Sequence, residues 1–502
     1  MLFWGFYRDG NDRTVLKDNG SMEQWAKKAG KLVFENAEEL AQENIVTFLN
    51  LALFWHSLGA WRRAYLHKGN AFQLQDIVGL GPRSLQTENT LESEIRRRRF
   101  WACYAMHCHT SERGNQFQLK GPIMTLPFPW PEEDFEDGVG RHGQNCIEDD
   151  RSDGALFSEL IRIMTIWSSV VSLLKSPDDT STHLRISAIM ALDERVSKWW
   201  RALPATLKLT PSTIHIMPRE IIPRILHINM LYHQSICALH ASLVPLFCGS
   251  QGEEGWHTTR QLSAQVAFEH ACEVSALVIA TLEVFPRTSA LPMFMGYAAY
   301  CGCAIQVPFL SCTKPAIKER VVRNVRANSK LLQLMAEDWK FASLLLSYIH
   351  YLHALHSKHG IVLEDEPKNI ARERLSVFDG DSSNAKTSIY EYIELLRTEG
   401  GGYGSAEEGG DLENHPVAAL ETEMSALPVS HNAPSASLEP TVFSQVQDYS
   451  VANGDGLLDI LYPFNTEEFN FAMDDDMLDF SQLEVDQLGL GYLDTAPWSR
   501  HC

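Results

Sequence analysis

The sequence lacks the features that mark several large classes of protein. It has only ten cysteines in 502 residues and no Cys-x-x-Cys pair, which speaks against a small disulfide-stapled secreted fold. It contains no phosphate-binding loop, Rossmann fingerprint or nucleophile elbow. Met1 to Arg8 include neither a basic start nor a long apolar stretch. We therefore expect no secretory signal peptide and a reducing compartment.

Long apolar runs are also scarce. One stretch without charge lies between Arg287 and Lys314 and is long enough to span a bilayer. Pro292, Gly296 and Pro308 interrupt it. We therefore interpret it as a buried core helix, with a membrane span as the alternative.

Negative charge is concentrated at one end of the chain. Residues 399–502 hold 20 acidic residues and one basic residue, a net charge of −19. Residues 1–398 hold 44 acidic and 42 basic residues, a net charge of −2. With 45% hydrophobic residues overall, the nearly neutral part has ample material for a large core. The acidic end is typical of a solvated interaction tail and does not suit binding to phosphate backbones.

Apolar residues recur at helical spacing through most of the nearly neutral part, and no stretch alternates with period two. This pattern predicts an all-α fold, in which a large multi-helix domain precedes a largely disordered acidic tail. Ser21 to Gln24 indicate a capping box that opens a helix toward Leu40. A proline-rich extended segment is expected at 121–131 and a surface loop at 137–154. Further helices are expected at 43–58, 61–78, 91–110, 155–175, 181–202, 218–247, 258–284, 293–311, 314–336 and 338–358.

The acidic end divides into two parts by composition. Residues 399–450 are rich in glycine and proline and predict a disordered linker. Residues 451–502 interleave apolar and acidic side chains, as amphipathic activation domains do. Mutual repulsion of the acids keeps the apolar side chains in water, where a partner with an apolar groove and a basic rim can bind them. The alternative is a tail that packs back on the body. The side chains predicted to bind the partner are Phe464, Phe469, Phe471, Met477, Leu478 and Phe480.

The most specific motif runs from Glu92 to Trp101, with the sequence Glu-Ser-Glu-Ile-Arg-Arg-Arg-Arg-Phe-Trp. On a helix Glu92 faces Arg96 and Glu94 faces Arg98, each an acid-first pair four residues apart. We interpret the charges as a solvated, self-paired run on a core helix. The alternative is a nuclear-import or phosphate-binding patch.

Candidate metal ligands occur without the spacing of a zinc site. Four soft ligands share one predicted helix, and four histidines recur at every third position, which drifts around a helix. The carboxylates at 475–479 could bind magnesium, but no helical core follows them. We therefore expect no catalytic, cofactor-binding or metal-binding residues, and no enzyme. The two sets of candidate ligands are Cys103, His107, Cys108 and His109, and His350, His353, His356 and His359.

The predicted helices at 43–58 and 61–78, the motif from Glu92 to Trp101 and the Leu126-Pro127 segment follow one another along the chain. In this order they resemble the regulatory middle homology region of fungal zinc-cluster transcription factors, and the resemblance covers residues 40–360. Trp199-Trp200 with Leu203-Pro204 is similar to a later motif of that family, and Tyr232-His233 through Leu239-His240 to another. The residues that carry the resemblance are Glu92, Glu94, Arg96, Arg97, Arg98, Trp101, Leu126 and Pro127.

The sequence departs from the family at two points. The six-cysteine cluster through which the family binds zinc and DNA is absent, because the first cysteine is Cys103. The resemblance therefore implies zinc only if an N-terminal cluster has been lost from this sequence. In addition, His107-Cys108-His109 stands where the family often has an Asp-Arg pair.

The resemblance implies a nuclear regulator of RNA polymerase II transcription, and the tail favours an activator. The body would report a signal, either a metabolite bound between helices or a partner protein, and a dimer is compatible with this picture. The tail would recruit the transcription machinery. DNA would be reached through the missing cluster, if the sequence is truncated, or through a partner protein. An all-α metabolite-binding protein or enzyme unrelated to transcription is the alternative.

We expect four parts in the chain. Residues 1–360 would form the regulatory domain, and 361–398 the terminal helices and boundary. Residues 399–450 would form the linker, and 451–502 the activation segment.

Overall fold

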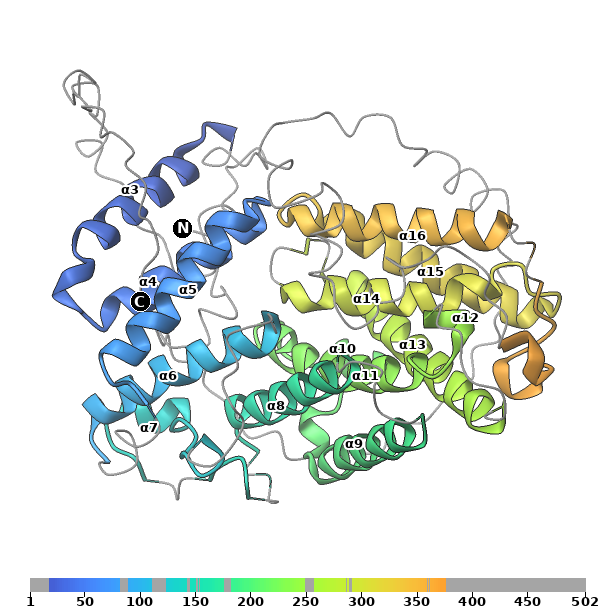
Figure 1. The fold of residues 1–502 in the computed structure, drawn as a ribbon, viewed down its shortest axis with the longest axis horizontal. Coiled ribbons are helices and arrows are strands. Elements are labelled where there is room, and N and C mark those ends of the chain that lie inside the picture. Colours follow the sequence, from blue (N-terminus) through green and yellow to red (C-terminus); the bar gives the residue numbers. More distant parts are fainter. Residues whose placement is uncertain are drawn as a thin grey trace, which may run out of the picture. The chain divides into compact units, whose positions relative to one another are not determined.

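The computed structural model describes residues 18–375 with gaps at 82–88, 111–122, 142–144, 150–151, 153, 176–181, 249–256, 286, 289–290, 359 and 361. Throughout these residues the regular structure is helical and no strand is present (Figure 1). The predicted all-α fold is therefore confirmed. The linker at 399–450 and the acidic segment at 451–502 lie outside the described residues.

Three helices form the N-terminal part: α3 (Ser21–Glu35), α4 (Glu43–Ser57) and α5 (Trp61–Ile77). Helices α4 and α5 pack along each other and α3 packs on α4. Gly59 connects α4 and α5 with a φ of 79°. A Cβ atom there would lie 2.9 Å from Cγ of Lys340, so the turn requires glycine for both its conformation and its space.

The predicted capping box at Ser21 is wrong. Gly20, with a φ of 72°, is the residue before α3, and the helix has no side-chain cap. Ser21 already belongs to the helix, and its N–H donates to Oδ1 of Asn19 at 3.0 Å. The helix also ends at Glu35, and a 3₁₀ turn, η1 (Ala37–Glu39), occupies most of the remaining distance to Leu40.

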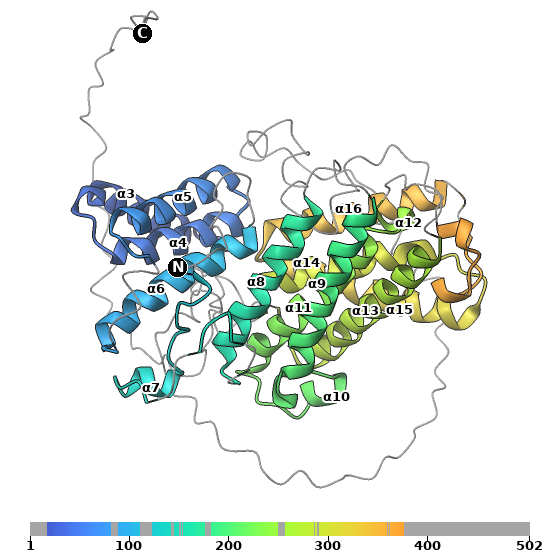
Figure 2. The ribbon, with the colours of Figure 1, turned by 60° about the horizontal axis from the view of Figure 1, so that its bottom comes forward.

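The next elements alternate between helix and extended chain. After α6 (Leu91–Thr110), residues 127–131 have no regular structure, which agrees with the proline-rich extended segment predicted there. The short α7 (Glu132–Glu136) was not predicted. Helix α8 (Leu156–Leu174) packs on α6, and α9 (Thr182–Ala202) packs on α8 (Figure 2). A 3₁₀ turn, η4 (Ala205–Leu207), and α10 (Pro211–Ile214) follow α9.

Helix α11 (Ile222–Ala241) is buried along nearly its whole length, because α8, α9, α13 and α14 all pack against it. The helix predicted at 218–247 is divided into α11 and α12 (Pro245–Cys248). Helices α13 (His257–Val284), α14 (Met293–Gln306), α15 (Pro315–Met335) and α16 (Lys340–Lys358) complete the packed group (Figures 1 and 2). Two 3₁₀ turns, η6 (Pro367–Asn369) and η7 (Arg372–Leu375), lie against α13, and η5 (Val307–Phe309) follows α14.

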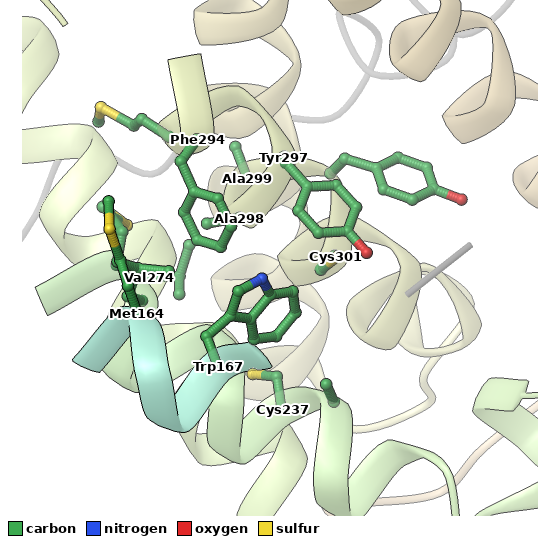
Figure 3. Close-up of a cluster of buried hydrophobic side chains, with 14 of the residues drawn as sticks. Met164, Trp167, Cys237, Val274, Phe294, Tyr297, Ala298, Ala299 and Cys301 are labelled. Atoms are coloured by element: carbon green, nitrogen blue, oxygen red, sulfur yellow. The ribbon is translucent and has the colours of Figure 1, made fainter. Parts of the chain in front are cut away.

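Aromatic rings fill the space where α8 meets α14 (Figure 3). The ring of Trp167 lies edge-on to Phe294, with 5.5 Å between centroids, and 6.3 Å from Tyr297. Cys237 of α11 and Val274 of α13 belong to the same cluster and come from neighbouring helices. Edge-to-face contacts of this kind favour one packing arrangement over a loosely packed apolar interior.

The uncharged stretch before Lys314 forms the buried helix α14, as predicted. Its 14 residues are too few to cross a bilayer, and residues 294–306 are all buried. Within the described residues, α8 and α13 are long and apolar enough to cross a membrane by length and composition. Helix α8 is mostly buried inside the protein, between α6, α9 and α11.

A buried polar network joins α13, α14 and α15. Gln306 is fully buried, and its Nε2 donates to Oγ of Ser275 at 2.9 Å and to the carbonyl oxygen of Gly302 at 3.0 Å. Its Oε1 accepts from Nδ2 of Asn324 at 2.8 Å. The amide of Gln306 therefore uses both its donor and its acceptor to contact neighbouring helices, as buried amides require.

We predict that Gln306→Leu lowers the free energy of unfolding by about 2–4 kcal/mol, because the amide of Asn324 loses its acceptor inside the core. Chemical denaturation followed by circular dichroism measures the change. Gln73→Leu, at an exposed position of α5, is the matched control and should change the free energy by less than about 0.5 kcal/mol. Equal effects of the two substitutions would contradict the proposed role of the network.

Candidate functional site

The arginine-rich motif lies at the start of α6, where its central charges are buried. Glu94 is 0% exposed, Arg97 1% and Arg98 4%. Glu94 accepts from Nη1 of Arg97 at 2.6 Å and from Nε of Arg98 at 2.9 Å. The predicted pairing of Glu94 with Arg98 is therefore confirmed, whereas the prediction of a solvated charge run is wrong for these three residues.

The burial arises from the segment that follows α6 in sequence. Nη1 of Arg98 donates to both carboxylate oxygens of Glu132 at 3.0 Å, and Nη2 donates to the carbonyl oxygen of Trp130 at 2.9 Å. The backbone N–H of Trp130 donates back to Glu94 at 2.8 Å. The guanidinium of Arg98 also lies 3.8 Å from the ring centre of Phe135. We call Glu94, Arg97, Arg98 and Glu132 the charge clasp.

Trp101 extends the attachment by one helical turn. Its ring is fully buried, and its Nε1 donates to the carbonyl oxygen of Pro127 at 3.0 Å. Leu126, beside Pro127, is also fully buried, and Phe128 lies 5.7 Å from the Trp101 ring. The helical motif and the Leu-Pro segment, about thirty residues apart in sequence, thus meet in one contact.

Two of the eight family-signature residues lie outside this contact. Glu92 is exposed and Arg96 is half-buried, and within the described part of the chain these two form no ion pair with each other. The predicted pairing of Glu92 with Arg96 is therefore wrong. The neighbouring Arg99 forms an ion pair with Glu43 of α4 at 2.7 Å. This pair joins α6 to the N-terminal helices.

Burial and hydrogen bonding act in opposite directions on the charge of Glu94. Burial raises the pKa of the Glu94 carboxyl above its usual value, and the guanidinium groups of Arg98 and Arg97 act against this shift. The three groups that contact its oxygens at hydrogen-bond distance, Arg97, Arg98 and the Trp130 N–H, are all donors, which an ionised carboxylate accepts best. Glu94 is thus held by three donors of the same chain.

The two sets of candidate metal ligands do not converge. Cys103 and Cys108 are buried in α6, and burial raises the pKa of the Cys108 thiol to about 12. His109 stacks on His227 of α11 with 5.0 Å between ring centroids. His356 is buried and His350 and His353 are half-buried in α16, while His359 lies outside the described residues. The described residues contain no group of three or more metal-ligating side chains.

A histidine cluster that the sequence did not predict lies between α9, α11 and α13. Nδ1 of His233 lies 3.1 Å from Nδ1 of His270, so one neutral ring donates to the other. Nε2 of His240 lies 3.7 Å from Oδ1 of Asp193, and its Nδ1 lies 3.2 Å from Oγ of Ser263. Tyr232 stacks on Trp200 beside the cluster at 3.9 Å. Tyr232, His233 and His240 belong to a family-like motif in the sequence, but no pattern in the sequence indicates that His270 or Asp193 lies beside them.

The line from Ser263 through His240 to Asp193 has the residue types of a hydrolase triad. Ser263 is only 1% exposed and lies within the regular helix α13, so its hydroxyl is not presented to a substrate. The arrangement therefore gives no support to the enzymatic alternative.

The part of the chain that contains the charge clasp is similar to known proteins. Residues 31–201 match the family model of the fungal specific transcription factor domain. The matched residues reach from α3 to the end of α9 and include the whole charge clasp. The resemblance drawn from the sequence is therefore confirmed over this part of the chain.

Two curated relatives are named as fungal regulators. One, a Schizosaccharomyces pombe protein named as a transcriptional regulatory protein, is 23% identical over 181 residues. The other, a Zn(2)-C6 fungal-type transcription factor of Fusarium oxysporum f. sp. lycopersici, is 23% identical over 366 residues. The matches cover 34% and 63% of this chain but only 21% and 37% of the relatives. No solved structure matches the chain.

We predict that Glu94→Gln lowers the free energy of unfolding by about 3–5 kcal/mol, because two buried guanidinium groups lose their shared counter-charge. Thermal and chemical denaturation measure the loss. Glu92→Gln, two residues earlier and exposed, should change stability by less than about 0.5 kcal/mol. A Glu94→Gln protein as stable as the Glu92→Gln protein would show that the clasp does not hold the domain together.

The histidine cluster predicts how stability depends on pH. Burial, reinforced by the neighbouring ring, lowers the pKa of His233 well below its usual value and lowers that of His270 to about 4. A neutral histidine whose pKa is lowered in the folded state destabilises nothing while the pH stays above its unfolded-state pKa, which is near 6.5. As the pH falls from there toward 4, the unfolded state binds the proton more readily, so the free energy of unfolding decreases. We expect the melting temperature to fall between pH 7.5 and pH 5. The combined variant His233→Gln/His270→Gln, whose amides can still hydrogen-bond, should show a smaller fall. The control His215→Gln, at an exposed position, should show the same fall in melting temperature as the unsubstituted protein. If the combined variant also showed that full fall, His233 and His270 would not be the source of the pH dependence.

Proposed function

We propose that the chain is part of a fungal transcription activator, with a helical regulatory body and an acidic activation segment at residues 451–502. The observation that carries this proposal is the family match over residues 31–201, which coincides with the clasp residues that the sequence motif singled out. The names of both relatives support a role in transcription. A nuclear location follows from the same role.

The body is proposed to report a signal and the acidic segment to recruit the transcription machinery. Sequence composition supports the second part, because 451–502 holds eleven acidic residues and one basic residue, with large apolar side chains interleaved among the acids. The segment lies outside the described residues, so its role is argued from its chemistry alone. A metabolite or a partner protein acting on the helical body is compatible with this role.

DNA contact is proposed to come from a cysteine cluster beyond this sequence or from a partner protein. The Fusarium relative is named as a Zn(2)-C6 factor, and this chain covers only 37% of it. No Cys-x-x-Cys pair occurs in the 502 residues, so zinc would enter only with such a cluster. We propose no cofactor or metal for the residues given.

The activation segment is tested by fusing residues 451–502 to an unrelated DNA-binding domain and measuring reporter transcription. Replacing the six apolar residues from Phe464 to Phe480 named above by alanine should reduce the reporter signal at least about tenfold, because they provide the buried part of the partner contact. Replacing the intervening acids by their amides should reduce it only in part, because charge mainly assists the encounter. Residues 399–450 fused in the same way are the control. Full activation by the alanine variant would overturn the proposal.

A further inference from the structure

Exposed apolar side chains are concentrated on the three N-terminal helices and their connections. In the part of the chain that the structure describes, sixteen large hydrophobic side chains are exposed, and eight of them lie between Asp18 and Gly81. This stretch is only a small part of the described chain. Single exposed apolar side chains are ordinary, but a concentration of them indicates an interaction surface. The eight are Trp25, Leu32, Phe34, Leu40, Leu58, Tyr65, Leu66 and Ile77.

Helix α3 is apolar over more of its circumference than its packing on α4 buries. Its buried stripe runs from Met22 to Val33. Trp25 and Leu32 lie seven residues apart and form a second stripe beside the buried one, where they are 38% and 49% exposed. The half-buried Ala29 lies between them on the same side. Within the described residues no neighbouring element buries this second stripe.

A strained leucine follows this stripe just past the end of α3. Leu40 has a φ of 54°, and among the described residues it is the one non-glycine residue in the left-handed region. Glycine adopts this conformation without the steric cost that a Cβ atom imposes. Leu40 is also 45% exposed, so burial in the body does not offset the cost. Backbone strain at an exposed apolar residue indicates that the side chain is needed for a contact. We call Trp25, Ala29, Leu32 and Leu40 the α3 surface.

We propose that residues 1–7 of this chain dock on the α3 surface. Residues 1–17 lie outside the described residues and are joined to the body at the start of α3. Residues 2–7 read Leu-Phe-Trp-Gly-Phe-Tyr, so every side chain except that of glycine is large and apolar. The ten residues that follow are mostly polar. Burial of the apolar group is favourable, and the first exposed apolar side chains along the described chain are those of α3.

The connection is long enough for this contact and short enough to favour it. Residues 8–20 can span up to about 40 Å when extended, whereas the 15-residue α3 is about 22 Å long. Gly20 has a φ of 72°, so the chain changes direction where α3 begins and is not required to continue along the helix axis. A short tether gives a local concentration in the millimolar range, so even a weak apolar contact is populated. The docked residues cover α3 and keep other apolar partners from it.

A photo-cross-linking amino acid in place of Lys28 in the full chain tests the docking. Lys28 is exposed and lies one turn from both Trp25 and Leu32. After irradiation and tryptic digestion, mass spectrometry should find cross-links to the peptide from Met1 to Arg8. The same amino acid in place of Glu319, an exposed residue of α15, is the control and should give no cross-link to this peptide.

Substitutions in the docked residues should weaken the contact. The combined variant Phe3→Ser/Trp4→Ser/Phe6→Ser should reduce the cross-link yield about fivefold or more, because these side chains provide most of the apolar area. The combined variant Val15→Ser/Leu16→Ser changes apolar side chains of the connection instead and should leave the yield unchanged.

Substitutions in the α3 surface test the contact from the other side. Leu32→Ser combined with Leu40→Gly should reduce the yield by a similar factor, although the glycine removes the backbone strain at residue 40. Leu66→Ser combined with Ile77→Ser removes two similarly exposed apolar side chains from α5 and should leave the yield unchanged. Melting curves of the variants show whether the body remains folded.

Three results would overturn the proposal. These are the absence of cross-links from position 28 to the first tryptic peptide, an unchanged yield in the triple serine variant, and an unchanged yield in a folded Leu32→Ser/Leu40→Gly variant. Cross-links found only between isotope-labelled and unlabelled chains in a mixture would assign the α3 surface to a second copy and also overturn it. Activation by residues 451–502 is measured in a separate fusion, so a failure of the proposed function would leave the docking of residues 1–7 unaffected.

Discussion

A single carboxylate enclosed by two guanidinium groups determines how the N-terminal half of the protein is arranged. Glu94 has no contact with water, so its charge is tolerable only while Arg97, Arg98 and the Trp130 N–H remain in place. Arg98 in turn fixes Glu132 and the carbonyl oxygen of Trp130. One helix turn thereby positions the extended segment, the start of α7 and the chain that leads to α8. Removing Glu94 would take the shared counter-charge from two buried guanidinium groups, so the members of the clasp are energetically coupled.

The same device holds other non-helical segments of the protein. Asn229 of α11 donates to the carbonyl oxygen of Leu207 at 2.9 Å and accepts from the N–H of Leu209 at 2.8 Å. Arg162 of α8 donates to the carbonyl oxygen of Asp149 at 2.5 Å, and Gln261 of α13 donates to that of Ile370 at 2.9 Å. In each case a polar side chain from a helix binds the backbone of a connecting segment. Buried connections need such partners, because their backbone groups have none within a helix or sheet.

Local patterns in the sequence predicted the helices well, because burial of one helix face leaves a period of 3.6 in the residues themselves. The spacing of Glu94 and Arg98 likewise predicted their pairing. Their burial was not predictable, because it depends on Trp130 and Glu132, more than thirty residues away. The contact of His233 with His270 is hidden for the same reason, since it joins two helices. At Ser21 a correct local motif was overruled by Gly20, whose left-handed conformation starts the helix one residue earlier.

These attachments are distributed unevenly along the protein, and few of them fall on α9. Among residues 183–202 only Ile189 and Val196 are buried. Its other contacts include the stack of Trp200 on Tyr232, the hydrogen bond from Nε1 of Trp199 to Glu159 at 2.8 Å and the approach of Asp193 to His240. Helices with few buried apolar contacts open first when a protein unfolds locally. Because α9 covers the histidine cluster, its opening would admit water to His233 and His270, whose neutral state depends on burial. Opening of α9 and protonation of these histidines are therefore linked, because each favours the other, and α9 lies at the end of the segment that the family match covers.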